Sequence, residues 1–156
     1  MKYIVYLLLL ILASCGPEAE MFQRQYVIEN GTGVPVELQF YRDGSLSLGF
    51  ETILLQNQER IAGLELDRSG GPWTDLSSEQ LLDRPSASFE SDSVRLIFNN
   101  EKIITYKITY IPLTFSPTER NLLRDTDYTS IGGDKFLFTI NESDFENAED
   151  CNGNCE

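Results

Sequence analysis

The chain of 156 residues contains no histidine. This absence excludes Ser-His-Asp and Cys-His catalytic groups, and it excludes zinc sites that need imidazole ligands. The sequence also has no serine followed three residues later by lysine, and its glycine pairs at 70–71 and 132–133 lack the glycine-rich patterns that bind phosphate. Acyl-transfer hydrolysis and nucleotide binding therefore have no support, and the sequence predicts a protein that is not an enzyme.

Positive charge is scarce in this sequence. Lys and Arg total 12, Asp and Glu total 25, and the formal net charge is -13. Proteins bind polyphosphates through Lys and Arg side chains that neutralise phosphates and release counterions, so nucleic acid is not expected as a partner. The apolar fraction of 41% is ordinary for a globular protein, and the length suits one domain.

A hydrophobic run long enough to span a membrane is also missing. The longest apolar run covers residues 3–13, whereas a membrane-spanning helix needs roughly 20 apolar residues. With Lys2 before it and small residues after it, the run fits the hydrophobic region of a signal peptide. The alternatives are an ordinary secretory signal cleaved elsewhere and a buried N-terminal strand.

The residues that end this run, Leu12-Ala13-Ser14-Cys15, resemble the lipobox of bacterial lipoproteins. The resemblance implies cleavage between Ser14 and Cys15, which removes a signal peptide of residues 1–14, and diacylation of the Cys15 sulfur. Two or three buried acyl chains hold a protein durably on a membrane. We therefore expect a bacterial cell-envelope protein whose N-terminal lipid binds the membrane.

The residues after Cys15 bear on which membrane this is. In enterobacteria an Asp directly after the lipid-bearing Cys would signal retention in the inner membrane, so Gly16 favours the outer membrane. Glu18 and Glu20 are similar to the acidic residues that often follow the lipid-bearing Cys in surface-exposed lipoproteins of the Bacteroidota. The sequence leaves open whether the domain faces the periplasm or the cell surface.

Strand signals dominate residues 25–148, which we predict to form one β-rich domain after a tether at 15–24. Apolar and polar residues alternate over 34–40, and this strand is expected to form a hairpin with the strand around 26–28. A clearer hairpin joins residues 93–98 to 102–110. About seven short strands predict an all-β, mainly antiparallel fold, either a β-sandwich or a partly open barrel.

Two or three short helices are expected in the connections. One covers residues 77–84 and begins with a serine cap. A second covers 116–124, where Ser116 and Glu119 have the spacing of a capping box with proline at the first helical position. A third begins after Asn141, which is a preferred N-cap residue. Beyond it we expect an acidic, cysteine-containing tail at 149–156.

Two later segments carry a further resemblance. Residues 92–102, DSVRLIFNNEK, and residues 136–148, FLFTINESDFENA, are similar to the C-terminal half of uncharacterised small lipoproteins of the Bacteroidota. The resemblance implies a location at the envelope and a β-rich fold. It brings no activity with it.

The sequence offers a few candidate sites. Asp125, Asp127 and Asp134 lie in a turn-rich stretch with oxygen ligands of the kind that Ca²⁺ prefers, although the simpler interpretation of this stretch is a polar connecting loop. Trp73, in a glycine-rich loop, could stack on a ligand or fold back over the core. Cys151 and Cys155 remain as a pair once Cys15 carries lipid, and we expect a disulfide between them, with a soft-metal site as the rival.

Together these observations predict a lipid-anchored envelope protein with a non-catalytic binding or scaffolding role. Its ligand is a protein or glycan that the sequence does not identify, and no cofactor is expected apart from the Ca²⁺ considered above. One alternative is a carboxylate-dependent enzyme that acts on glycans, because such chemistry needs only two acidic side chains. The other is an accessory or inhibitory subunit of another envelope protein.

Overall fold

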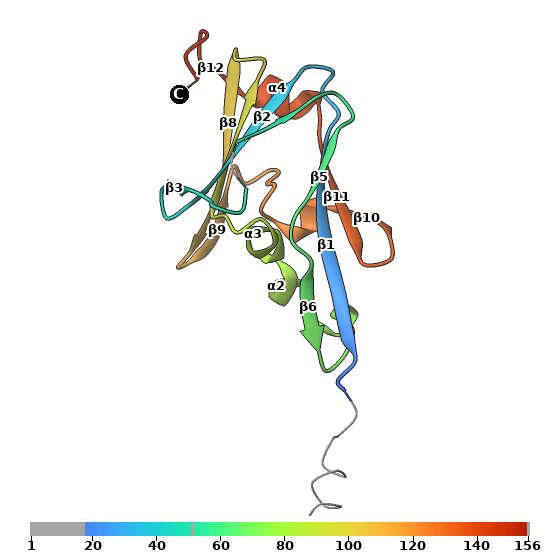
Figure 1. Cartoon of the computed structure of the whole chain (residues 1–156). Coiled ribbons are helices and arrows are strands. Elements are labelled where there is room, and N and C mark those ends of the chain that lie inside the picture. The colour runs from blue at the N-terminus through green and yellow to red at the C-terminus, as the bar shows by residue number, and fades with distance from the viewer. Residues whose placement is uncertain (1–17, 51, 156) are drawn as a thin grey trace, which may run out of the picture.

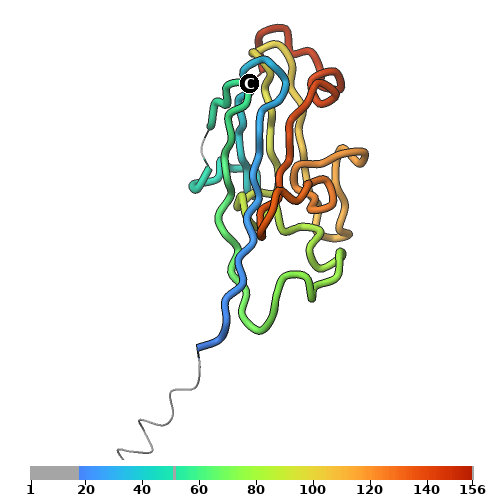
Figure 2. Tube along the Cα trace, turned by 90° about the vertical axis from the view of Figure 1, so that its right-hand side faces the viewer, coloured from blue at the N-terminus to red at the C-terminus, as the bar shows by residue number. Residues whose placement is uncertain are grey.

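The computed structural model describes residues 18–50 and 52–155, and in this part of the chain two β-sheets face each other (Figures 1 and 2). The predicted β-sandwich is confirmed. The smaller sheet has five strands: β1 (Met21–Asn30), β5 (Arg60–Ala62), β6 (Leu66–Ser69), β10 (Thr129–Gly132) and β11 (Lys135–Ile140). The larger sheet has seven: β2 (Val36–Arg42), β3 (Ser45–Leu46), β4 (Ile53–Leu55), β7 (Ser93–Phe98), β8 (Lys102–Tyr110), β9 (Leu113–Ser116) and β12 (Glu149–Asp150).

The order of strands separates neighbours in the sequence. In the smaller sheet the order is β10-β11-β1-β5, with β6 also paired to β1; in the larger it is β12-β8-β7-β2-β3, with β4 paired to β2 and β9 to β8. β1 and β11 run parallel, which long connections between distant parts of the chain permit, and the other pairs are antiparallel. The fold is therefore mainly antiparallel, as predicted.

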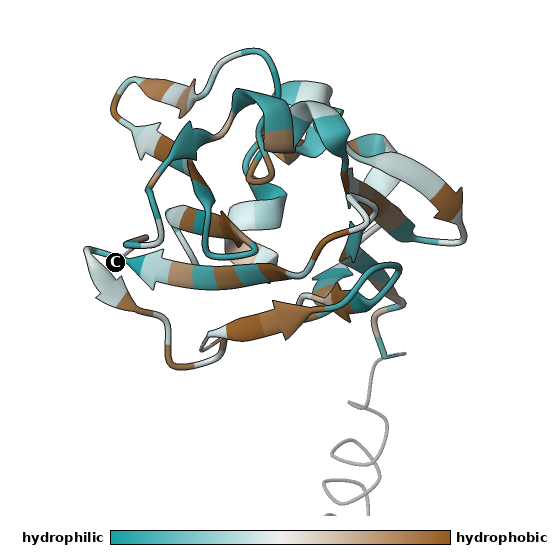
Figure 3. Cartoon of the chain, turned by 90° about the horizontal axis from the view of Figure 1, so that it is seen from above, coloured by the Kyte–Doolittle hydropathy of each residue, from teal (hydrophilic) through white to brown (hydrophobic). Residues whose placement is uncertain are grey.

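The core fills the space between the two sheets because each strand buries alternate side chains. Figure 3 shows hydrophobic and hydrophilic residues alternating along the strands. Fully buried side chains from the two inner faces meet there: Tyr26, Ile28, Leu38, Phe40, Leu96, Phe98, Tyr106, Phe138 and Ile140. Aromatic rings pack edge to face at several of these contacts, for example Tyr106 on Phe138.

One predicted hairpin is confirmed and the other is wrong. β7 and β8 pair from Ser93 with Lys107 to Phe98 with Lys102. β1 and β2, by contrast, lie in different sheets, and the turn that was expected to close a hairpin carries the chain across the sandwich. The buried side chain of Asn30 stabilises this crossing, since its amide donates hydrogen bonds to the carbonyls of Val34 and Leu55 at 2.7 and 2.9 Å.

The short helices occur largely where capping residues predict them. α2 (Ser78–Leu81) and α4 (Glu142–Asn147) begin after Ser77 and Asn141, and each has a complete capping box. α3 (Arg84–Ser88) follows α2 and includes Pro85 near its start, so helical structure does not stop at that proline. The 3₁₀ turns η1 (Trp73–Asp75) and η2 (Asp125–Asp127) complete the set within the described residues.

The helix expected at 116–124 is not formed, and that prediction is wrong. Ser116 is the last residue of β9, and residues 117–124 after it form bends and turns in place of a helix. The guanidinium of Arg124 donates hydrogen bonds to the backbone carbonyls of Thr118 and Glu119, at 2.8 and 3.0 Å, and holds them in a non-helical loop. Side chains that satisfy backbone groups in this way compete with helix formation.

The domain extends beyond its predicted limits at both ends. β1 begins at Met21, inside the segment expected to be a tether, and β12 pairs Glu149 and Asp150 with β8. The segment predicted to be a signal peptide, with Ser14 and Cys15, lies outside the described residues. Among the residues that are described, no helix has both the length and the hydrophobicity needed to cross a bilayer.

Candidate ligand-binding groove

The outward face of the larger sheet carries a groove whose base comes from β2 and β7. Because Leu38 and Leu96 point into the core, the alternate residues of these strands point outward. Glu37 lies directly opposite Ile97 and also opposite Leu54 of β4, and Gln39 lies opposite Arg95. Polar and apolar side chains are thus placed side by side on a rigid sheet surface.

Hydrogen bonds order the polar side chains along β2. The hydroxyl of Tyr41 donates to Oε1 of Gln39 at 2.7 Å, and Nε2 of Gln39 donates to Oε1 of Glu37 at 2.7 Å. The guanidinium of Arg95 lies 5.1 Å from the centre of the Tyr41 ring, within the range of a cation–π contact. The orientation of Gln39 is therefore fixed from both sides before any ligand arrives.

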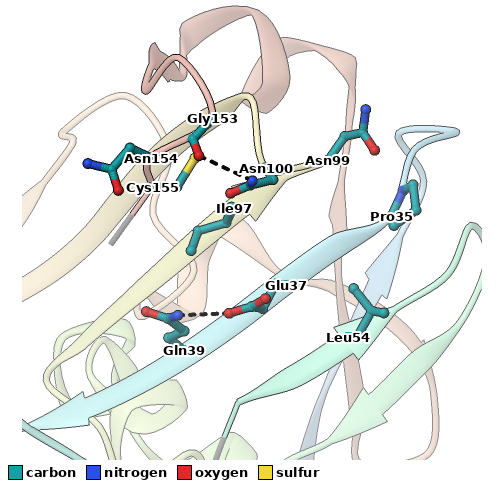
Figure 4. Close-up of a pocket in the computed structure, with 10 residues that line it drawn as sticks. All are labelled: Pro35, Glu37, Gln39, Leu54, Ile97, Asn99, Asn100, Gly153, Asn154 and Cys155. Atoms are coloured by element: carbon teal, nitrogen blue, oxygen red, sulfur yellow. Dashed lines mark hydrogen bonds between the residues drawn. The ribbon is translucent and has the colours of Figure 1, made fainter.

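The C-terminal loop forms the upper wall of the groove (Figure 4). Cys151 and Cys155 are joined by a disulfide, with Cα atoms 5.1 Å apart. The loop is attached to the β7–β8 turn, since the N–H of Cys151 donates to the carbonyl of Glu101 at 2.9 Å and Nδ2 of Asn100 donates to the carbonyl of Gly153 at 3.4 Å. Residues 149–155, which were expected to form a tail, are thus part of the domain.

The groove has a volume of about 560 Å³ and a lining rich in carboxamides. Its lining residues are Pro35, Glu37, Gln39, Leu54, Ile97, Asn99, Asn100, Gly153, Asn154 and Cys155. A carboxamide both donates and accepts hydrogen bonds, whereas a carboxylate only accepts. With Glu37 as the single ionisable side chain of this lining, the groove is suited to an uncharged ligand that carries many hydroxyl or amide groups.

A second cleft, of about 690 Å³, lies where α4 meets β8 and the loop after β9. At its base the carboxylate of Asp144 accepts hydrogen bonds from Tyr106, from the Asn141 N–H at 2.8 Å and from Arg120. Burial, together with the negative charge of Asp144, raises the pKa of the Tyr106 phenol well above its ordinary value. Both oxygens of Asp144 are occupied by protein groups, so this cluster holds the fold together.

The three aspartates proposed as calcium ligands are bonded elsewhere or exposed. Asp125 accepts hydrogen bonds from Arg24, at 2.5 Å, and from Tyr26, and Asp127 forms an ion pair with Arg124 at 2.7 Å. Asp134 is exposed in the turn between β10 and β11. Within residues 18–50 and 52–155 no group of three or more such side chains is arranged to hold a metal ion, so the Ca²⁺ site stays a prediction without an assembled ligand set.

Trp73 does not present its ring to a ligand. It is 5% exposed, and its indole N–H donates a hydrogen bond to the carbonyl of Phe22 at 3.0 Å. The stacking hypothesis is therefore wrong for this conformation, and the alternative, in which the ring folds back onto the domain, describes it. The physical reason is that a buried indole needs a partner for its N–H, and the backbone of β1 provides one.

Comparison of the chain with models of known protein families, with characterised proteins and with solved structures found no match. The groove was not predicted from the sequence, and its residues Glu37, Gln39 and Asn100 were not among the candidates. The only signal for it was the alternation over residues 34–40, which identifies the outward positions of a strand. Which other strands lie beside those positions is decided by the sheet order.

Proposed function

We propose that this chain is a lipid-anchored protein of the bacterial cell envelope that binds a neutral glycan in the groove on the larger sheet, without catalysing a reaction on it. The observation that carries the proposal is the hydrogen-bonded row from Tyr41 through Gln39 to Glu37, beside the apolar side chains of Leu54 and Ile97. Polar groups held in place next to an apolar surface favour binding, because little side-chain freedom is lost when a ligand arrives.

The chemistry of the lining supports a glycan over other ligands. Sugar hydroxyls donate and accept hydrogen bonds, as do the carboxamides of Gln39, Asn99, Asn100 and Asn154. The side chain of Leu54, which is 56% exposed, offers an apolar surface for the C–H face of a sugar ring. An anionic polymer is disfavoured by Glu37 and by the net charge of -13.

The absence of catalysis is inferred from what the acidic side chains do. The buried or half-buried carboxylates of Asp125, Asp127 and Asp144 each bond to an arginine. A glycosidase needs two carboxyl groups free to face the same glycosidic bond. These three carboxylates are already paired with arginines, which favours a binding protein over the alternative of a glycan-active enzyme.

The glycan proposal is tested by measuring the affinity of the full chain for a panel of neutral polysaccharides. Gln39→Ala should weaken binding by about tenfold, which corresponds to the loss of one good hydrogen bond. The matched control is Gln23→Ala, an exposed glutamine of β1 on the other sheet, which should bind like the wild type. If no polysaccharide binds, or if both variants bind equally, the proposal is contradicted.

The same panel separates the two alternatives. Release of new reducing ends from a bound polysaccharide would favour the enzyme. Failure to bind any polysaccharide, combined with co-purification of one envelope protein in a defined ratio after crosslinking in cells, would favour the accessory subunit.

The anchor has its own test. Cells that express the full chain are labelled with a palmitate analogue, and the mass of the N-terminal peptide is measured by mass spectrometry. Cys15→Ala should abolish labelling, whereas Cys155→Ser, which also removes one cysteine, should retain it. Protease added to intact cells then reports which side of the membrane the domain occupies, with a periplasmic protein as the protected control.

A further inference from the structure

We propose that the tip of the β8–β9 hairpin, residues 110–113, rests in the headgroup region of the membrane to which the chain is anchored. This inference rests on the proposed lipid anchor and adds a second point of contact to it. The proposed partner is the surface of a lipid bilayer that contains anionic lipids.

The tip exposes several neighbouring apolar side chains. Ile111 is 93% exposed, Tyr110 51% and Leu113 39%, and Pro112 between them is exposed as well. Tyr110 and Leu113 form the last pair of the ladder, so Ile111 and Pro112 project beyond the end of the sheet. An exposed cluster of this kind is typical of a site that contacts a partner or a membrane. Tyr110 adds the amphipathic aromatic ring that is enriched at membrane interfaces.

The sequence of the hairpin itself differs in charge from the rest of the chain. Residues 102–118 contain no Asp or Glu and two lysines, and no longer acid-free stretch follows Glu18 in the sequence. Lys107 is exposed on β8, three residues before Tyr110. An anionic bilayer repels a domain of net charge -13 over most of its surface, but it attracts an exposed lysine that flanks an apolar tip.

The fold links this hairpin to the end of the domain from which the anchor departs. The hydroxyls of Tyr110 and Ser86 in α3 are 2.6 Å apart. Ser88 of the same helix exchanges hydrogen bonds with the backbone of Leu64, two residues before the strand β6 that pairs with the first residues of β1. Figure 1 shows the start of β1 and the free end of the β8–β9 hairpin in the same lower half of the molecule, and Figure 2 agrees.

Chain length keeps this end close to the bilayer. Five residues lie between Cys15 and Met21, and even when fully extended this connection reaches about 20 Å. Contact at the tip would then limit rotation of the domain about its tether. β8 has nine residues and runs from the Asn99–Asn100 end of the groove to the tip, so that end of the groove would be held about 27 Å from the tip and away from the membrane.

The test places a tryptophan at the tip of the full chain. Ile111→Trp is compared with Leu54→Trp, a control at a leucine of the groove that is 56% exposed, and the wild type supplies the contribution of the buried Trp73. Each protein is reconstituted in phosphatidylglycerol-containing vesicles with or without brominated lipids, which quench nearby tryptophans. We expect the added fluorescence at position 111 to be quenched at least twice as strongly as that at position 54.

Two readouts separate this inference from the anchor. If mass spectrometry finds lipid on Cys15 but quenching is equal at positions 111 and 54, the tip contact is overturned and the anchor still holds. An unmodified Cys15 overturns the anchor. In that case the protein is added to the same vesicles at excess lipid, and the quenching of the added tryptophans tests the tip contact without the anchor. Preferential quenching at position 111 in that experiment supports the tip contact, and equal quenching overturns it.

Discussion

The hydroxyl of Tyr106 on β8 donates a 2.6 Å hydrogen bond to the carboxylate of Asp144 in α4, and so joins two residues that are 38 positions apart in the sequence. Asp144 is also the residue that completes the capping box of α4, and it forms an ion pair with Arg120. One buried carboxylate therefore fixes the start of a helix, a strand of the larger sheet and the loop that follows β9.

Asp144→Asn should lower the free energy of unfolding by about 2 kcal/mol, because it leaves Arg120 without its partner, although partial exposure of Arg120 limits the cost. Denaturant unfolding measures this loss. Glu146→Gln, an exposed acid on the same helix, is the control and should change stability by less than about 0.5 kcal/mol. Equal effects of the two variants would show that the cluster does not stabilise the fold.

Ser91→Ala should leave the protein as stable as the wild type or more stable, by up to about 1 kcal/mol. Among the described residues, the Ser91 hydroxyl is the one buried side-chain polar atom without a hydrogen-bond partner. The control is Ser86→Ala, which removes a buried hydroxyl that bonds to the Ser91 carbonyl and to Tyr110 and should be destabilising. A clear loss of stability in Ser91→Ala would mean that this hydroxyl has a partner in solution.

Stability should be insensitive to tyrosine ionisation below about pH 9 and should fall above the ordinary phenol pKa of 10.0. Burial raises the pKa of Tyr26, Tyr106 and Tyr128 in the folded state, so above pH 10 the unfolded chain loses these protons while the folded chain retains them. Each proton that the folded chain retains and the unfolded chain loses lowers the free energy of unfolding by about 1.4 kcal/mol per pH unit. The measurement is circular dichroism recorded together with tyrosinate absorbance. Ionisation of Tyr26, Tyr106 and Tyr128 without loss of structure would contradict this prediction.

Reduction of the Cys151–Cys155 disulfide should cost at most about 2 kcal/mol of global stability, because the bond closes a very short loop. The local effect should be larger. Hydrogen exchange should increase at the backbone of Cys151, whose N–H bonds to Glu101, while the core strands β7 and β8 remain protected. Global unfolding on reduction would show instead that the loop supports the whole domain.

The sequence by itself determined the features that depend on neighbouring residues. The alternation of residues 93–98 and 102–110 identified a hairpin, and the N-cap chemistry of Ser77 and Asn141 located two helix starts. Such signals are local because capping and strand periodicity act within a few residues. The pairing of the last two cysteines was also predictable, since four positions separate them.

Only the tertiary structure decided which distant segments meet. The pairing of β1 with β11 rather than with β2, the ion pair of Asp125, the burial of Trp73 and the groove beside the C-terminal loop all join residues far apart in the sequence. Periodicity shows that a strand has an outward face, but it does not show what lies beside that face. Strand order is selected by burial of the whole core at once, and a carboxylate becomes structural when the fold places an arginine against it.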